Sequence, residues 1–155
     1  LWPCLTKIKW GIWCILITDK TDKINKIIMK KMNNILIKGF HFINLILIIF
    51  YLYPGSILGY FMYNSLSIQP QITRDFLISS NHFYVFILLS TVGILAYHNT
   101  KKINLLIKYL FLISIFLEFF HTIIPNRGFE WSDLFGNILG VIVVIIIYKV
   151  RDKYV

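Results

Sequence analysis

The side chains best suited to chemistry lie close together in the sequence, between Glu118 and Gly140. A carboxylate, an imidazole and a guanidinium follow one another at Glu118, His121 and Arg127, and Asp133 adds a second carboxylate. Such a set can hold an anionic group and exchange protons with it. The flanking segments are nearly all apolar, and ionisable groups inside or beside a bilayer are costly. The stretch therefore predicts either a structural polar network or a functional site.

A metal site is one alternative for these residues. Glu118-x-x-His121 resembles half of a carboxylate-bridged di-iron motif, but that chemistry requires a second such pair on another helix, which the sequence does not contain. His82, Glu118 and His121 can in principle surround a single ion, although no other metal signature flanks them. We therefore expect no metal and no cofactor. The sequence also contains no nucleophile elbow, P-loop or dinucleotide fingerprint.

The composition indicates an integral membrane protein. Of the 155 residues, 57% are hydrophobic and 15% are charged, whereas about 25% of the residues in a soluble domain are charged. The apolar residues form long Ile, Leu and Phe runs, which favour helices in lipid over a large soluble core. Cys4 and Cys14 have no metal-like spacing and no histidine nearby, so we interpret them as ordinary thiols.

The apolar runs predict an all-α fold, an integral membrane bundle of four transmembrane helices. Proline residues mark two of the span ends, Pro54 after the first span and Pro125 after the third. The expected spans run from about Ile35 or Gly39 to Tyr53, from His82 to Tyr97, from Leu105 to Ile124 and from Leu134 to Tyr148.

The basic residues predict how the spans are oriented. Of the 16 Lys and Arg residues, 14 fall on the side that holds both termini, and only Arg74 and Arg127 fall on the other side. Cytoplasmic loops are rich in Lys and Arg, so both termini are predicted to be cytoplasmic. The net charge of +9 then reflects topology, with a bilayer whose inner leaflet is anionic as a sufficient partner. It gives no support to nucleic-acid binding.

The predicted organisation is a membrane domain between two basic segments. The apolar run from Ile8 to Thr18 is too short to span a bilayer. Because Met29 and Met32 stand just before the first long apolar run, we expect the working protein to start at one of them. The expected parts are a basic cytoplasmic segment (residues 1–31), a four-helix membrane domain (35–148) and a basic cytoplasmic tail (149–155).

This topology brings residues that are distant in sequence to one depth in the outer third of the bilayer. Glu118 and His121 share a helix face at i and i+3. Ser132 or Asp133 is placed to cap the N-terminus of the fourth span. Arg127 is interpreted either as a structural ion-pair partner of Glu118 or Asp133 or as the contact for an anionic ligand. We call the predicted group the outer polar cluster, and it comprises His82, Glu118, His121, Arg127, Asp133 and Asn137.

Two further features of the spans bear on packing. Gly136 and Gly140 are one turn apart, a spacing that lets a neighbouring helix approach closely and bring its polar side chains near Asn137. Aromatic residues at span ends, Tyr51 among them, are expected to form the usual interfacial belt.

The same residues resemble the C-terminal signature of the VanZ-like family of membrane proteins. In that family a Glu-x-x-Gln run ends a helix, a Pro-x-Arg turn follows, and an Asp-x-x-x-Asn-x-x-Gly start opens the last helix. Ser80-Asn81-His82 is similar to the family's histidine-containing start of the second span, and His121 departs from the commoner Gln. The resemblance covers about residues 40–148, and the matching signature residues are Glu118, His121, Pro125, Arg127, Phe129, Asp133, Asn137 and Gly140.

The resemblance implies a small multi-pass protein of the bacterial inner membrane, and it implies no demonstrated reaction. The family's name comes from a member associated with low-level resistance to teicoplanin, a lipoglycopeptide that acts at the outer face. One hypothesis is an envelope protein whose outer polar cluster binds a lipid-linked cell-wall precursor or a lipophilic antibiotic. A second is a membrane-embedded enzyme that acts on a lipid-linked phosphate or peptide, with His82 or His121 as general base. A third is a structural accessory subunit without a ligand. At the level of sequence the three stay open, as do the ligand and the oligomeric state.

Overall fold

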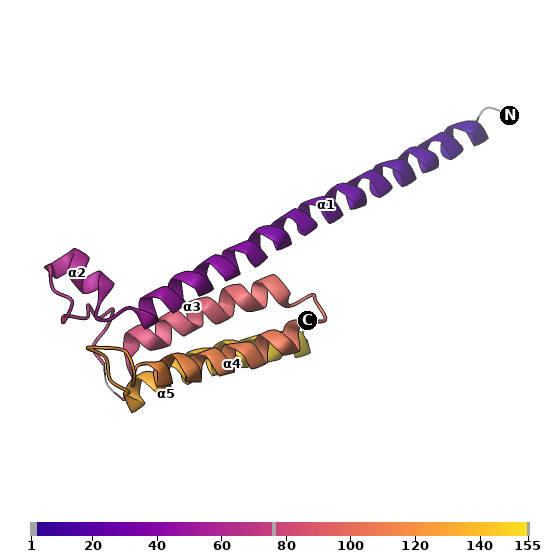
Figure 1. Ribbon diagram of the computed structural model, residues 1–155. Helices are drawn as coiled ribbons and strands as arrows, with labels where there is room; N and C mark the ends of the chain where they lie inside the picture. Colours follow the sequence, from indigo (N-terminus) through magenta and orange to yellow (C-terminus); the bar gives the residue numbers. More distant parts are fainter. Residues whose placement is uncertain (1–2, 76, 155) are drawn as a thin grey trace. The chain divides into compact units, whose positions relative to one another are not determined.

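The computed structural model describes residues 3–75 and 77–154, and it describes the side chains of these residues other than 3–20 and 22. The thiols of Cys4 and Cys14 lie outside the described side chains. All regular structure in the described part of the chain is helical (Figure 1). The elements are α1 (Pro3–Leu52), α2 (Ile57–Tyr63), α3 (Ser80–Tyr97), α4 (Ile103–Phe120) and α5 (Trp131–Tyr154).

Four of these helices are long and apolar enough to cross a membrane, which confirms the predicted all-α fold with four spans. The chain is therefore a multi-pass membrane protein. The apolar segments are Lys23–Leu52, Ser80–Tyr97, Ile103–Phe120 and Trp131–Tyr154. Their outward faces carry exposed apolar side chains such as Ile49, Leu95, Leu112 and Ile146, which suit contact with lipid rather than water.

The helix bounds differ from the predicted spans at several ends. The first helix begins well before Ile35, because the Lys-rich segment ahead of the apolar run contains no Pro or Gly between residues 12 and 38 and its straight-chain side chains suit a helix. The third ends at Phe120 rather than Ile124, since the amides of His121, Thr122 and Ile123 bond carbonyls only three residues back. Tight turns of this kind are frequent at helix C-termini.

The chain divides within α1 into two compact units, Leu1–Ile35 and Leu36–Val155. In the first unit the described backbone belongs to α1 alone. The second contains the rest of α1 and all the other helices, and it holds every residue of the outer polar cluster.

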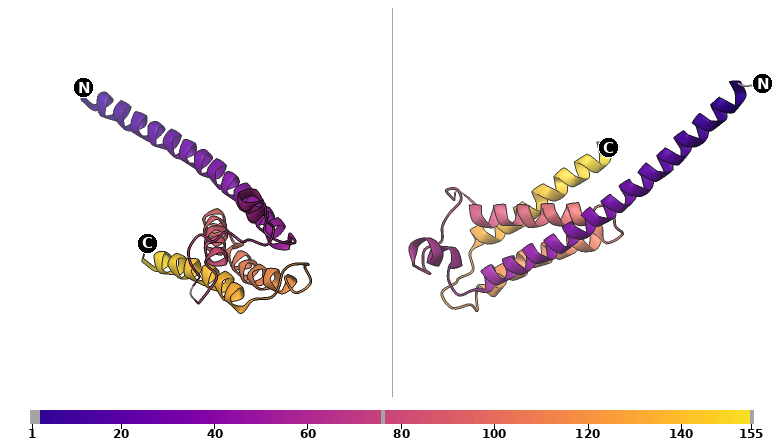
Figure 2. Two further views of the ribbon diagram at one scale, coloured as in Figure 1. Left: turned by 90° about the vertical axis from the view of Figure 1, so that its left-hand side faces the viewer. Right: turned by 90° about the horizontal axis from the view of Figure 1, so that it is seen from above.

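Within the second unit, α5 packs against both α3 and α4 (Figure 2). The approach to α3 is close because two glycines of α5 face its backbone. A Cβ added at Gly136 would lie 2.8 Å from the carbonyl oxygen of Ser79, and one at Gly140 would lie 2.6 Å from that of Phe83. The predicted close approach at these glycines is thus observed, and α3 is the partner helix. Fully buried side chains then fill the interior, among them Phe86, Leu89, Leu110 and Val141.

The segment between α1 and α3 begins with a sharp change of direction at Pro54-Gly55. Gly55 has φ +102, a value that side chains disfavour, so the chain can leave α1 abruptly there. The short helix α2 follows, with the Ser56 hydroxyl accepting a hydrogen bond from the Gly59 amide. Asn64, at φ 52, ends α2 in the left-handed conformation.

Candidate functional site

Five of the six predicted cluster residues meet inside the second unit. Side chains of α3, α4 and α5 converge there, and Tyr51 of α1 joins them. Short contacts link the five that meet, which are His82, Glu118, His121, Asp133 and Asn137. Arg127 instead donates to the backbone carbonyl of Gly55. His82, Glu118, His121 and Asn137 are buried, and Asp133 is partly buried.

Glu118 is the centre of the cluster and is fully buried. Its Oε1 accepts a hydrogen bond from the backbone amide of Glu130, at 3.0 Å. Its Oε2 lies 3.2 Å from Nδ1 of His121 and 3.9 Å from Nδ1 of His82. Although the shorter distance suits a hydrogen bond, Oε2 has no hydrogen-bond partner of acceptable geometry among the described residues. A buried carboxylate oxygen is thus flanked by two imidazoles that leave it unsatisfied.

His82 stands at the start of α3 with both ring nitrogens in contact with oxygen atoms. Nε2 lies 3.1 Å from Oδ2 of Asp133. Nδ1 lies 3.1 Å from Oδ1 of Asn137 and 3.0 Å from the Tyr51 hydroxyl. His82 therefore connects the first turn of α5 with the end of α1.

Asn137 ties three helices together from a fully buried position. Its Nδ2 donates to the backbone carbonyl of Ser114 in α4, at 3.2 Å. Its Oδ1 accepts a hydrogen bond from the Tyr51 hydroxyl, at 2.8 Å. Since buried polar side chains are costly unless paired, these bonds account for an amide at this depth.

Tyr51 is a site residue that sequence reasoning missed. Its position at a span end predicts an interfacial ring, but the side chain is buried and its ring stacks on that of His121, with centroids 5.6 Å apart. The Tyr51 backbone carbonyl also lies 3.1 Å from Nε2 of His121. Nothing in the local sequence separates Tyr51, in the last turn of α1, from the exposed Tyr53, which follows the end of that helix.

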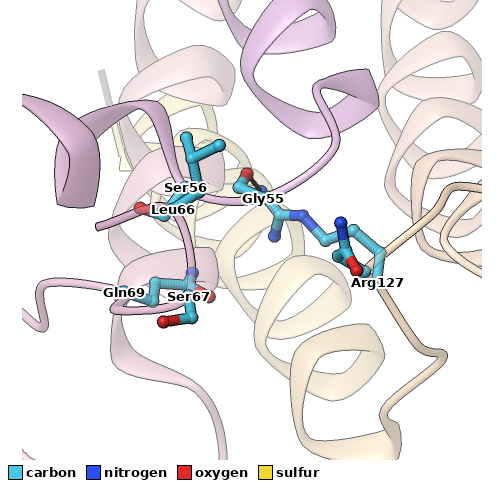
Figure 3. Close-up of a pocket in the computed structure, with 7 residues that line it drawn as sticks. Gly55, Ser56, Leu66, Ser67, Gln69 and Arg127 are labelled. Atoms are coloured by element: carbon cyan, nitrogen blue, oxygen red, sulfur yellow. Dashed lines mark hydrogen bonds between the residues drawn. The ribbon is translucent and has the colours of Figure 1, made fainter. Parts of the chain in front are cut away.

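Arg127 does not pair with Glu118 or Asp133, which corrects the sequence expectation. Among the described residues it forms no ion pair, and its Nη2 donates instead to the carbonyl of Gly55, at 2.7 Å. Figure 3 shows Arg127 reaching from the α4–α5 loop toward Gly55, beside a cavity of about 390 Å³. Nη2 also lies 3.5 Å from the carbonyl of Phe50, one of the last carbonyls of α1, which lack helical partners. Asn126, just before Arg127, is left-handed at φ 61. Nε of Arg127 is buried without a partner.

The capping prediction for Ser132 or Asp133 is also wrong. α5 begins at Trp131, and the Glu130 carbonyl accepts the first amides, those of Asp133 and Leu134. The helix starts two or three residues earlier than predicted because Trp131 and Ser132 continue it without a break. Asp133 therefore lies inside the first turn, where a negative charge is still favourable, and its carboxylate is available to His82.

A cavity of about 520 Å³ reaches the cluster from one side. Most of its wall is apolar and comes from α1, α2 and α3, for example Ile46, Val85 and Leu88. Its polar wall residues are Tyr51, Ser56, Gln69, Gln71, Asn81, His82, His121 and Arg127. The cavity thus joins an apolar channel to two histidines of the cluster and to the guanidinium of Arg127.

The loop before α3 closes part of this cavity and is held by its own hydrogen bonds. The Asn81 side chain accepts from the Ile72 amide at 2.9 Å and donates to the Pro70 carbonyl at 2.6 Å. The Ser80 hydroxyl donates to the Thr73 carbonyl at 2.7 Å, and its amide bonds the Asp75 carboxylate at 2.7 Å. This loop is consequently an ordered wall, anchored to the first turn of α3.

The fold and the site define the class: a four-span membrane protein with a buried histidine–carboxylate cluster at one end of the bundle and an apolar cavity leading to it. No protein-family model, no curated protein and no solved structure matches the chain.

Proposed function

We propose that the chain is a VanZ-like integral membrane protein of the bacterial inner membrane, with both termini cytoplasmic, that handles a lipid-linked cell-wall precursor or a lipophilic antibiotic of the teicoplanin type. The observation that carries this proposal is the cavity of about 520 Å³, which joins an apolar wall to Arg127, His82 and His121. The charge distribution supports the orientation, because basic residues concentrate on the side of the termini.

The cavity has the two properties that a lipid-linked anion requires. Its volume lies within the ~300–1,000 Å³ of typical ligand pockets, and its apolar wall suits an acyl or prenyl chain. At the polar end, Arg127 retains a buried Nε without a partner, while its Nη2 is already bonded to Gly55. A guanidinium with a free donor is well suited to a phosphate or carboxylate oxygen. In this arrangement the outer polar cluster borders the head group of the lipid and not its acyl or prenyl chain.

The test is a pair of matched substitutions on the helix surfaces. Leu88 lines the cavity and Leu112 does not, yet each side chain is 54% exposed, so neither is needed for the core. We expect Leu88→Trp to fill the cavity and abolish protection against teicoplanin, while Leu112→Trp behaves like the unaltered chain. The measurement is susceptibility of cells that express each variant at equal levels, together with retention of a prenyl phosphate by the purified proteins. Equal protection and equal lipid retention by the two variants would rule out the cavity as the site.

An enzymatic function is the second candidate, and the His82–Asp133 pair is the observation that favours it. A carboxylate 3.1 Å from Nε2 would stabilise the imidazolium that forms when this nitrogen takes up a proton as general base, and His82 also lines the cavity. Purified protein would then release phosphate or peptide from a labelled lipid precursor, and His82→Gln would lose that turnover. Binding of the precursor without turnover would contradict the enzymatic function and support the binding function.

A purely structural role is the third candidate, favoured by hydrogen bonds of the cluster that connect all four spans. It predicts that Glu118→Gln combined with Arg127→Gln leaves a folded protein with full protection. A well-folded double variant that has lost protection would contradict it.

A further inference from the structure

His121 presents one nitrogen to a backbone carbonyl and the other to a carboxylate. Nε2 lies 3.1 Å from the carbonyl oxygen of Tyr51, and a carbonyl can only accept, so Nε2 carries the hydrogen. In the neutral ring Nδ1 then holds a lone pair. That lone pair faces Oε2 of Glu118 across 3.2 Å. Two electron pairs at this distance repel each other unless a positive species lies between them.

His82 also presents an unprotonated ring nitrogen to a carboxylate, and a different set of partners determines which nitrogen that is. The amide orientation of Asn137 is set by its Nδ2, which donates to the Ser114 carbonyl, so its Oδ1 accepts from both the Tyr51 hydroxyl and Nδ1 of His82. Nδ1 of His82 is therefore the protonated nitrogen. In the neutral ring the lone pair of Nε2 then faces Oδ2 of Asp133 across 3.1 Å.

The cluster thus holds two carboxylates, each facing a ring nitrogen that needs a cation. Two added protons would satisfy it by making both rings imidazolium, and one divalent metal ion would supply the same total charge. The metal has the better structural fit, because metal-binding histidines generally donate their other N–H to a carbonyl or amide, as both rings do here. The second, independent sign is Oε2 of Glu118, which is fully buried in the cluster without a hydrogen bond.

We propose that His82, Glu118 and Asp133 bind one divalent transition-metal ion of the zinc class, with Nδ1 of His121, 3.2 Å from Oε2 of Glu118, as the nearest donor for a fourth position. Each of the three ligands offers an atom, and these atoms lie within 4.8 Å of one another. Ligand atoms of a tetrahedral zinc site are about 3.3 Å apart, close to the 3.1 Å that separates His82 from Asp133. Modest side-chain movement of Glu118 completes the set.

The donor set distinguishes between ions. A mixture of imidazole and carboxylate suits zinc and its neighbours in the first transition series, whereas Mg²⁺ and Ca²⁺ take oxygen ligands. Three protein ligands leave a fourth position for water or for another donor. The site borders the cavity through His82 and His121, but all three proposed ligands belong to the cluster itself, so this proposal does not depend on whether a lipid occupies the cavity.

The test measures metal binding by the 155-residue chain in nanodiscs, purified through a tag without histidine. Cys4→Ser and Cys14→Ser are introduced into every protein, so that thiols contribute no zinc site. After treatment with a chelator the protein is titrated with Zn²⁺, and bound metal is measured by elemental analysis. Co²⁺ provides a visible spectrum that reports its ligands. We expect one equivalent of Zn²⁺ and at least tenfold weaker binding of Mg²⁺.

Three variants identify the ligands. Glu118→Gln and Asp133→Asn should each weaken Zn²⁺ binding more than tenfold and change the Co²⁺ spectrum, and the control Glu130→Gln should bind as the parent does. Glu130 lies in the same turn, but its exposed carboxylate is outside the site, and only its backbone amide touches Glu118. Asp133 is the less buried ligand, so its variant tests the site if Glu118→Gln fails to fold, as judged by circular dichroism and gel filtration.

Three results would overturn the proposal. One is a folded parent protein that retains no stoichiometric Zn²⁺, which would leave protons as the cations of the cluster. Another is Zn²⁺ binding that Asp133→Asn leaves unchanged. The last is Mg²⁺ binding as tight as that of Zn²⁺, which would exclude histidine as a ligand.

Discussion

Replacing Gly140 by Ala tests the close contact between α3 and α5 on which the cluster depends. The added Cβ would lie 2.6 Å from the Phe83 carbonyl oxygen and 2.9 Å from Cβ of Phe86, so the helices must separate by about 0.4 Å to restore even a 3.0 Å contact. Overpacking of this kind costs about 1–3 kcal/mol. In the helix itself, Ala is favoured over Gly by about 0.8–1 kcal/mol.

Gly39 supplies the matched control. It lies within α1, and a Cβ added there meets nothing within 4 Å. Gly39→Ala carries the same gain in helix propensity without the steric cost, so the difference between the two variants isolates the contact. We expect Gly140→Ala to be less stable than Gly39→Ala by about 1–3 kcal/mol.

The assay is equilibrium unfolding in mixed micelles, with increasing denaturing detergent and loss of structure followed by circular dichroism. Separation of the helices should also stretch the 3.1 Å contact between His82 and Asn137, one turn from Gly140. Metal binding should therefore weaken in Gly140→Ala but not in Gly39→Ala. If the stabilities of the two variants agree to within about 0.5 kcal/mol, below the overpacking cost, the reasoning about this interface is refuted.

Two further substitutions probe the polar contacts of α1 in the same unfolding assay. Arg127→Gln removes the charged donor from the Gly55 carbonyl, and we expect a loss of about 1.5–3 kcal/mol, typical of a hydrogen bond to a charged group; unchanged stability would mean that water replaces Arg127 there. Tyr51→Phe removes the hydroxyl that donates to Asn137 but keeps the ring stacked on His121. We expect it to cost about 0.5–1.5 kcal/mol, and a gain in stability would show that the hydroxyl is poorly paired.

The outer polar cluster shows how much of a site can be predicted from the spacing of residues in the sequence. Glu118 and His121 meet because they are three residues apart on one helix, and His82 and Asn137 meet because Gly136 and Gly140 admit α3. The i, i+3 spacing of Glu118 and His121 and the one-turn spacing of the two glycines can both be recognised in the sequence. The contact of Arg127 with the Gly55 carbonyl was not visible, because a turn of a few residues can direct a long side chain to either neighbour and the conformation of this turn has no signal in its residues.

The sequence by itself determined the number of spans and most of the ionisable groups that meet between them, because a long apolar helix interrupted by a carboxylate has few stable arrangements in lipid. The tertiary structure decided which atoms face one another. It buried Tyr51 beside His121, turned Asp133 from a predicted cap into the partner of His82, and left Oε2 of Glu118 without a hydrogen bond. Those outcomes depend on helix rotation and on loop conformation, which arise from packing between segments distant in the chain and therefore have no local signature.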